Sequence, residues 1–299
     1  MELENIRQVV VIGAGRMGSQ IATLLSRVGK YSVTIVDVSD EILNTALQWI
    51  KSDLKQYFVD KGKITQSEME EIVARINGTT NIAEAAKNAD FVIEAVIENL
   101  EIKKKVFIEL DKNAPPDAIL ASNTSGLSIT EMASATKRPD KVVGMHFFNP
   151  VAVMKLVEVV KGAFTSDETL SFVRTLAKKL GKEPVVCLDV SYGFLANRAY
   201  GAMLREAVQM VWERVASPED IDKALKLGYN LPMGPLELGD MIGSWAIMAA
   251  SEEDRIKELG PERGRLHPLI RWMVRAGYTG GRGKKGIYAF WQEVLSKSK

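Results

Sequence analysis

The chain has little of what an exported or membrane protein would need. It contains a single cysteine, Cys187, so no intrachain disulfide can form, and a reducing compartment suits it. No apolar run approaches the ~18 residues that a helix needs to span a bilayer. The N-terminus begins with acidic residues and lacks the basic segment that opens a signal peptide. These absences predict a soluble, cytoplasmic protein that does not act at a membrane.

Net charge and histidine are also scarce. Basic residues number 39 and acidic residues 38, so the net charge of +1 creates no field that would draw the chain to nucleic acid. Cys187 lies in the apolar run VVCLD with no histidine near it in sequence, which favours a buried side chain over a nucleophile. The chain has two histidines, and we predict no metal site.

The first 187 residues alternate apolar, β-branched runs with helically spaced segments. The runs that predict strands are 8–13, 31–37, 91–97, 118–122, 142–147 and 155–160, and the apolar run EPVVCL follows them. Helices are expected after the first strand and over about 39–60, 66–75, 99–112 and 167–180. This alternation predicts an α/β, Rossmann-type doubly wound sheet domain over 1–187, with a helical-hairpin insertion at about 39–75.

Strand patterns stop after about residue 187. Helical patterns follow near 194–214, 218–227, 235–251 and 265–276, and prolines and glycine-rich turns separate them. The sequence therefore predicts an all-α C-terminal domain over 188–299.

A glycine pattern, G-x-G-x-x-G, follows the first predicted strand and opens the next helix. In that context the glycines allow a tight turn, a close approach to a pyrophosphate, and close packing of helix on strand. The residues predicted to line a dinucleotide here are Gly13, Ala14, Gly15, Arg16, Met17 and Gly18. Asp37 ends the second predicted strand, where an acid accepts hydrogen bonds from ribose hydroxyls and repels a 2′-phosphate. We therefore expect NAD, with a flavin or nucleotide site, or a glycine turn without a ligand, as the alternatives.

His146 and Glu158 pose the sharpest question in the sequence. His146 ends a predicted strand, where open α/β sheets bind their ligands, and Glu158 interrupts the apolar run LVEVV twelve residues later. Because a buried carboxylate without a partner is costly, Glu158 needs one. A histidine oriented by a carboxylate suits proton removal from an alcohol. A packed core histidine and a solvent-facing glutamate are the alternatives, and for His267, before a proline at a helix start, we expect a structural role.

Over nearly its whole length the sequence resembles the L-3-hydroxyacyl-CoA dehydrogenases, including short-chain 3-hydroxybutyryl-CoA dehydrogenases. The segments that carry the resemblance are VVVIGAGRMGSQIA, FVIEAVIENLEIKKKVF, SNTSGLSIT, GMHFFNPVAVMKLVEVV, GFLANR, LGYNLPMGPLELGD and GGRGKKGIYAF. The resemblance implies a hydride transfer between NAD and L-3-hydroxyacyl-CoA or 3-oxoacyl-CoA thioesters. It also implies a homodimer formed through the helical domain, whose segment 198–251 is rich in Ala, Met, Leu and Trp.

The resemblance also implies roles for individual residues. His146 matches the catalytic base and Glu158 its carboxylate partner, while Ser125 and Asn197 match residues that contact the substrate. The positions that match the cofactor site are Glu98, Lys103, Ser125 and Asn149, and Arg282 stands near a lysine of the family pattern. The hairpin matches the part of the family that contacts CoA, which makes Lys55 and Lys61 candidates for its phosphates, with a solvated helix face as the alternative.

The sequence departs from the family pattern near the expected acyl site. Gly126 follows the SNTS run, Ala152 replaces a common proline, and Tyr192-Gly193 replaces a common proline-glycine pair. None of these changes removes a catalytic group, but Gly126 and Tyr192 are expected to alter acyl-chain preference. Two other functions stay open: a dehydrogenase of a free 3-hydroxy acid, such as a sugar acid, and a non-catalytic relative that kept the fold.

Overall fold

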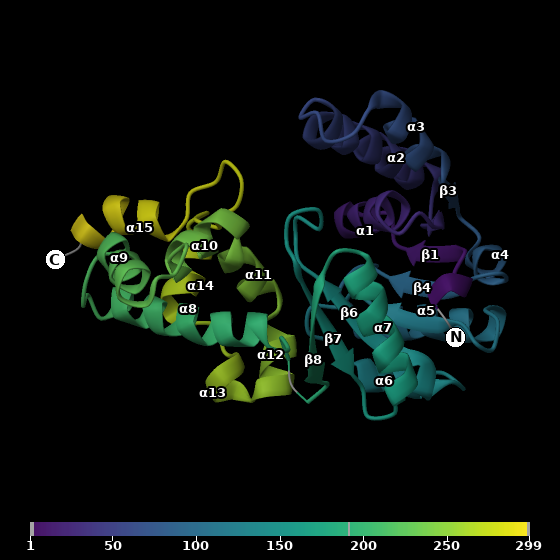
Figure 1. Ribbon diagram of the computed structural model, residues 1–299. Coiled ribbons are helices and arrows are strands. Elements are labelled where there is room, and N and C mark those ends of the chain that lie inside the picture. Colours follow the sequence, from purple (N-terminus) through teal and green to yellow (C-terminus); the bar gives the residue numbers. More distant parts are fainter. Residues whose placement is uncertain (1–2, 191, 298–299) are drawn as a thin grey trace. The chain divides into compact units, whose positions relative to one another are not determined.

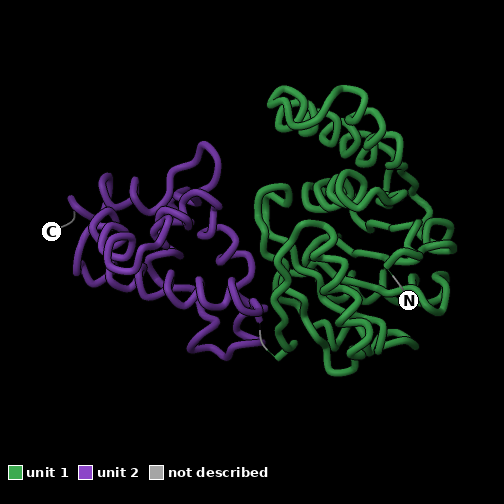
Figure 2. The backbone as a smooth tube through the Cα atoms, in the orientation of Figure 1, with its two compact units in different colours: residues 1–190 green, residues 191–299 purple. Residues whose placement is uncertain are grey.

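The computed structural model describes residues 3–190 and 192–297 and divides the chain into two compact units, 1–190 and 191–299 (Figure 2). The division falls a few residues after the predicted boundary at 187. Leu188 still pairs with Lys161 as the last residue of a strand, and the Asp189 N–H donates to the Lys161 carbonyl oxygen. The first unit therefore keeps its last strand whole.

The first unit is built on one eight-stranded sheet with the order β3-β2-β1-β4-β5-β6-β7-β8 (Figure 1). Its strands are β1 (Gln8–Ile12), β2 (Ser32–Val36), β3 (Ile76–Thr79), β4 (Phe91–Glu94), β5 (Ile119–Ser122), β6 (Val142–Phe147), β7 (Leu156–Lys161) and β8 (Glu183–Leu188). All neighbours pair in parallel except β6 and β7, which are antiparallel. The predicted doubly wound, mostly parallel sheet is confirmed.

Helices cover the sheet of the first unit. They are α1 (Arg16–Arg27), α2 (Asp40–Leu54), α3 (Gln66–Ala74), α4 (Ile82–Ala86), α5 (Leu100–Asn113), α6 (Ile129–Ser134) and α7 (Asp167–Lys179). The predicted hairpin consists of α2, a π-helical turn at Lys55–Val59, and α3. The side of α2 that bears Leu43, Ala46, Ile50 and Leu54 is buried. This apolar face packs the hairpin next to α1 (Figure 1).

The second unit is helical and has its own core. Its helices are α8 (Ala196–Trp212), α9 (Pro218–Tyr229), α10 (Pro235–Ile242), α11 (Ser244–Ala250), α12 (Glu252–Leu259), α13 (Pro261–Gly264), α14 (Pro268–Arg275) and α15 (Ile287–Glu293). Trp245, with no exposed surface, lies in that core. The single helix expected over 235–251 is wrong, because Gly243 has a φ of +76° and ends α10. Among the described helices, none is long and apolar enough to cross a bilayer.

A buried ion pair joins the carboxyl ends of β4 and β5 to α5. Glu94, the last residue of β4, has no exposed surface, and its carboxylate accepts hydrogen bonds from Lys103 Nζ at 2.7 Å and Ser122 Oγ at 2.6 Å. The Val96 N–H also donates to Glu94 Oε1, at 2.6 Å, so the chain turns there and the strand expected over 91–97 ends early. Burial raises the pKa of Glu94, and Lys103 and its other donors oppose that effect.

The same ion pair reaches the loop after β5. Lys103, also without exposed surface, lies 3.3 Å from Glu98 Oε2. Glu98 Oε1 accepts hydrogen bonds from Thr124 Oγ1 at 2.6 Å and from the Ser125 N–H at 2.8 Å. The backbone position of Ser125 therefore depends on a continuous network that begins at Glu94.

Replacing Glu94 tests how much this pair stabilises the unit. In Glu94→Gln the Lys103 ammonium loses its closest carboxylate, and the part-exposed Glu98 compensates its charge only in part. The free energy of unfolding should therefore fall by about 3–5 kcal/mol. The double variant Glu94→Gln/Lys103→Gln should recover part of that loss, because no uncompensated buried charge remains. Urea denaturation measures each value.

The control for this prediction is an exposed ion pair of the same unit. Asp167, whose side chain is 85% exposed, pairs with Lys161, so Asp167→Asn should leave the urea midpoint nearly unchanged. Equal, small effects of Glu94→Gln and Asp167→Asn would contradict a structural role for the buried pair.

Candidate active site

The glycine loop after β1 requires glycine at two positions and leaves space at the third. Gly13 has a φ of +106°, and a Cβ there would lie 2.5 Å from the Ala95 carbonyl oxygen. A Cβ on Gly18 would lie 1.8 Å from the Gly13 carbonyl oxygen, so α1 packs on this loop only without a side chain. A Cβ on Gly15 would meet no atom within 4 Å. Because Gly15 precedes the first turn of α1, the helix N-terminus is open to an anionic group such as a pyrophosphate.

Asp37 lies beside this loop, directly after β2. Its Oδ2 accepts a hydrogen bond from the Ala14 N–H at 2.6 Å, and its Oδ1 accepts one from the Val38 N–H at 2.7 Å. The side chain is half-buried, and each carboxylate oxygen has a further lone pair for a hydroxyl group. This arrangement fits the ribose diol of NAD and opposes a 2′-phosphate.

Arg16 and Met17 belong to the first turn of α1 but face different surroundings. The Arg16 guanidinium lies 3.2 Å from Asp53 Oδ2 and 5.2 Å from the centre of the Trp49 ring, both on α2. Met17 packs partly buried against the core. Arg16 therefore ties the helix that opens the cofactor site to the hairpin.

His146 and Glu158 face each other across the antiparallel pair β6 and β7. The two residues are direct partners in the strand register, and His146 Nδ1 lies 2.8 Å from Glu158 Oε2. His146 is 3% exposed and Glu158 has no exposed surface. The short connection between the strands forces this antiparallel pairing, which brings both side chains to one face of the sheet. The suspected partner of Glu158 is therefore present in the structure.

The carboxyl ends of β1, β4, β5 and β6 share one edge of the sheet, because these strands are parallel. The glycine loop, Glu98, Ser125 and Asn149 all follow strands at this edge, and His146 lies near the end of β6. Ser125 and Asn149 are exposed, as Glu98 is in part. Ligands of open α/β sheets bind at this edge, so the first unit gathers these predicted residues where a dinucleotide would lie.

The remaining predicted residues lie elsewhere. Lys55 and Lys61 are exposed on the hairpin, Lys55 at the start of the π-helical turn. Asn197, near the start of α8, and Arg282, in the loop before α15, are exposed residues of the second unit. The first unit by itself therefore brings together the His146–Glu158 pair and the predicted cofactor residues other than Arg282, but not the complete predicted set.

Two sequence-based expectations about other residues are confirmed. Cys187 is buried, and burial raises the pKa of its thiol to about 11, with the negative charges of Glu158 and Asp189 adding to the effect. The thiol thus stays protonated at neutral pH and is a poor nucleophile. His267 precedes α14, where its Nδ1 accepts a hydrogen bond from the Leu269 N–H at 3.1 Å, and burial lowers its pKa. Its role is that of a helix cap.

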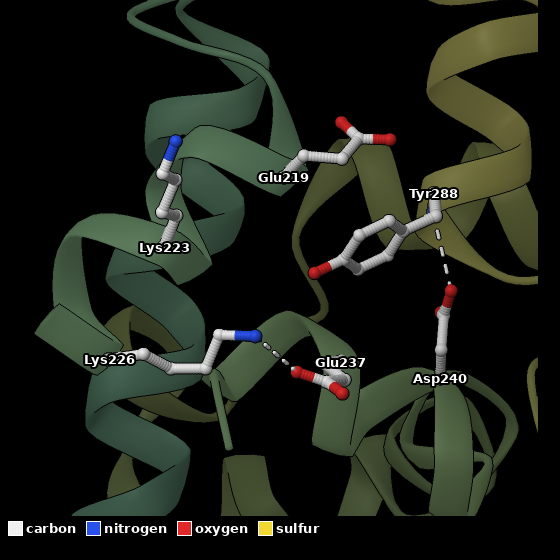
Figure 3. A pocket seen from close by; sticks show the side chains of 6 residues that line it. All are labelled: Glu219, Lys223, Lys226, Glu237, Asp240 and Tyr288. Carbon is white, nitrogen blue, oxygen red and sulfur yellow. Dashed lines mark hydrogen bonds and ion pairs between the residues drawn. The ribbon is translucent and has the colours of Figure 1, made fainter. Parts of the chain in front are cut away.

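The second unit contains a hollow of about 560 Å³ whose chemistry differs from that of the candidate site. Figure 3 shows the side chains that line it, which are Glu219, Lys223, Lys226, Glu237, Asp240 and Tyr288. Lys226 Nζ bonds Glu237 Oε2 at 3.0 Å, and the Tyr288 N–H donates to Asp240 Oδ2 at 3.3 Å. These contacts join α9, α10 and α15, and none of the predicted site residues lines the hollow.

Three polar residues that support the site are not predicted from the sequence. Glu94 interrupts the apolar run FVIEAVI in the same way that Glu158 interrupts LVEVV, so the signal was present. Gln20 on α1 and Lys182 before β8 both bond the loop between β6 and β7. Neither residue carries a local sequence signal, because its partners are distant along the chain. They lie 129 and 131 residues from Gln20, and 28 and 31 residues from Lys182.

Comparisons with known proteins cover both units of the chain. Residues 8–190 match the family model for the NAD binding domain of 3-hydroxyacyl-CoA dehydrogenase, and residues 193–290 match the model for its C-terminal domain. A probable 3-hydroxybutyryl-CoA dehydrogenase of Bacillus subtilis is 45% identical over 285 residues, which cover 95% of this chain and 98% of that protein.

Solved structures are similar over the same length. An (S)-3-hydroxybutyryl-CoA dehydrogenase from Ralstonia eutropha is 42% identical with a TM-score of 0.87, over 95% of this chain and 99% of that one. An NAD⁺-dependent 5-dehydrogenase of a pyridine carboxylic acid is 32% identical with a TM-score of 0.73, over 95% of this chain and 90% of that one. These findings show that the chain belongs to the 3-hydroxyacyl-CoA dehydrogenase family of NAD-dependent oxidoreductases.

Proposed function

We propose that this chain interconverts L-3-hydroxyacyl-CoA and 3-oxoacyl-CoA thioesters, with His146 as the acid–base group and Glu158 as its partner. The observation that carries the proposal is the buried hydrogen bond between His146 Nδ1 and Glu158 Oε2, at the sheet edge that bears the cofactor loop. The similarity to two 3-hydroxybutyryl-CoA dehydrogenases supports the substrate class.

The hydrogen bond decides which imidazole nitrogen does the chemistry. The Glu158 carboxylate can only accept a hydrogen bond, so His146 Nδ1 must donate one to it. A neutral His146 therefore carries its proton on Nδ1, and Nε2 is the basic nitrogen. In the oxidative direction, Nε2 takes the hydroxyl proton as the C3–H bond breaks and the C3–O bond becomes a carbonyl. The resulting imidazolium faces a carboxylate in a buried setting, which stabilises its charge. In the reductive direction, His146 returns the proton to the oxygen.

Other residues of the chain hold the reacting groups. The bound NAD supplies a hydride acceptor in one direction and a hydride donor in the other. The proposal assigns Ser125 and Asn197 as hydrogen-bond donors to substrate oxygens, and a well-placed donor of this kind is worth roughly 2.7–4 kcal/mol. The Glu98 contact to the Ser125 N–H would keep that serine in place.

Substitution of the pair tests its role. Turnover with acetoacetyl-CoA and NADH should fall by about 10²-fold or more in His146→Gln, which has no acid–base group, and in Glu158→Gln, which cannot stabilise the imidazolium. Glu168→Gln, an exposed change on α7, is the matched control and should keep wild-type turnover. NADH binding measured by fluorescence should persist in all three variants. Near-normal turnover of His146→Gln would overturn the assignment of the base.

A comparison of substrates separates the two catalytic hypotheses. We expect turnover of acetoacetyl-CoA to exceed that of free acetoacetate by a large factor, since the hairpin lysines offer phosphate partners to CoA. Lys55→Ala/Lys61→Ala should raise KM for the thioester by about 10-fold with little change in kcat, because binding energy alone is lost. Lys178→Ala, an exposed lysine on α7, is the control. Equal turnover of the free acid would favour the dehydrogenase of a free 3-hydroxy acid, which the similarity to the pyridine carboxylic acid dehydrogenase keeps in view.

The second unit supports the proposal of a homodimer. Its exposed large apolar side chains include Leu227, Tyr229, Met241, Ile242 and Ile247, on α9, α10 and α11, which are available to pack against a second copy of the chain. Size-exclusion chromatography with light scattering should give twice the chain mass of 33.0 kDa. Met241→Lys/Ile247→Lys should shift the mass toward the monomer, whereas Ile108→Lys, a 51% exposed position on α5, should not. A wild-type chain at 33.0 kDa alone would refute the dimer. A cytoplasmic location and a part in fatty acid β-oxidation belong to the same proposal.

A further inference from the structure

The loop between β6 and β7 is held by a glutamine of the dinucleotide-binding helix. Gln20, on the second turn of α1, accepts a hydrogen bond from the Val151 N–H at its Oε1, at 2.7 Å. Its Nε2 donates to Asn149 Oδ1 at 3.1 Å. One side chain thus bonds both a backbone group and an exposed side chain of the loop that joins His146 to Glu158.

The polarity of these two contacts follows from hydrogen-bond chemistry. The Val151 N–H can only donate, so the Gln20 atom that faces it must be the carbonyl oxygen. The Gln20 amide nitrogen then faces Asn149, and because that nitrogen can only donate, Asn149 must present its own carbonyl oxygen. The Asn149 NH₂ group is therefore turned away from Gln20. The Val151 N–H therefore sets the orientation of the Gln20 side-chain amide and, through it, the orientation of the Asn149 side-chain amide.

The backbone of Val151 is also held through its carbonyl oxygen. Lys182 Nζ donates to the Val151 carbonyl oxygen and, at 2.8 Å, to the Met154 carbonyl oxygen. Lys182 is 6% exposed, and Val151 is 1% exposed. The backbone of Val151 is thus hydrogen-bonded through both its N–H and its carbonyl oxygen, which holds this part of the loop in a defined position relative to α1.

We propose that Gln20 is a positioning residue that orients the exposed Asn149 side chain as a hydrogen-bond donor for a carbonyl acceptor on the nicotinamide half of the cofactor. The inference rests on the proposed place of Asn149 in the cofactor site, and it adds the residue that sets the direction of that hydrogen bond. The carboxamide oxygen is the carbonyl that the nicotinamide half offers.

Two replacements of Gln20 distinguish this role from a structural one. Gln20→Glu keeps the acceptor for the Val151 N–H but has no hydrogen for Asn149 Oδ1, so the Asn149 amide should turn over and present its oxygen to the cofactor. Gln20→Met loses both hydrogen bonds and leaves Asn149 free to rotate. A structural role predicts greater harm from Gln20→Met. The orientation role predicts greater harm from Gln20→Glu, because an acceptor then meets an acceptor.

Calorimetric titration with NADH and with ADP-ribose provides the measurement. For NADH, Kd should rise about 10-fold in Gln20→Glu and less in Gln20→Met, since loss of one hydrogen bond with an unmatched acceptor costs about that factor. For ADP-ribose, which lacks the nicotinamide, neither variant should differ from wild type. ADP-ribose also detects repulsion between the new carboxylate and the pyrophosphate, because that repulsion would weaken the binding of both ligands equally.

A matched control and the contrary outcomes complete the test. Gln292 in the second unit also donates its Nε2 to an acceptor, Glu219 Oε1 at 3.2 Å, so Gln292→Glu makes the same change away from the loop and should leave both affinities intact. The inference would be overturned if Gln20→Glu weakened the binding of NADH and of ADP-ribose equally. It would also be overturned if the affinity for NADH fell more in Gln20→Met than in Gln20→Glu. A wild-type protein that binds ADP-ribose but not NADH would instead count against the proposed cofactor site, before any variant is compared.

Discussion

A carboxylate without exposed surface, in the middle of a β-strand, is the constraint on which the candidate site depends. Glu158 lies on β7, a strand with neighbours on both sides, and its side chain has no exposed surface. Leaving such a charge unpaired costs more than most single interactions contribute to stability. The strand register places His146 directly opposite, at hydrogen-bond distance. The hydrogen bond with His146 thus offsets part of the cost of burying Glu158.

The direction of the strands determines where this pair lies. Six strands of the sheet, β3 to β6 in spatial order, are parallel, so their carboxyl ends form one edge. The chain then reverses through a short loop, and β7 runs antiparallel to β6. A reversal at this point keeps Glu158 beside the end of β6, close to the loops that follow β1, β4 and β5. The glycine loop and the His146–Glu158 pair share an edge because of this one antiparallel connection.

Polar contacts hold the loops at the carboxyl-terminal edge of the sheet. Glu94 and Lys103 form an ion pair without exposed surface, and it extends through Glu98 to the Ser125 N–H. Gln20 and Lys182 hold the loop that follows β6. Functional groups at a sheet edge lie on loops, and loops need such contacts to keep a defined geometry. In this chain the loop after β5 and the loop after β6 each have a polar anchor.

The sequence predicted those parts of the fold that follow from local patterns. The strand over 142–147 has the predicted bounds, because an apolar run is a direct sign of a buried strand. β3 was not predicted, since INGT has one buried residue, Ile76, and its strand geometry comes from pairing with β2. Gly243 divides a predicted helix by adopting a left-handed backbone, which a periodicity argument does not detect.

The site shows the same division between local and distant causes. His146 and Glu158 were found because both are unusual where they stand in the sequence. The Glu98 contact to Ser125 and the Gln20 contact to Asn149 join residues far apart along the chain, and only the fold brings them together. A carboxylate in an apolar run proved informative at Glu158, and the same reasoning applied to Glu94 would have found the second buried pair.

The most direct test of the central claim is the pH dependence of kcat/KM for the wild-type protein in both directions. Oxidation of L-3-hydroxybutyryl-CoA requires a neutral imidazole, and reduction of acetoacetyl-CoA requires an imidazolium. The account predicts opposite limbs, with oxidation losing rate as the pH falls and reduction losing rate as the pH rises. Two profiles that lose rate on the same side of the pH range would contradict the role of His146.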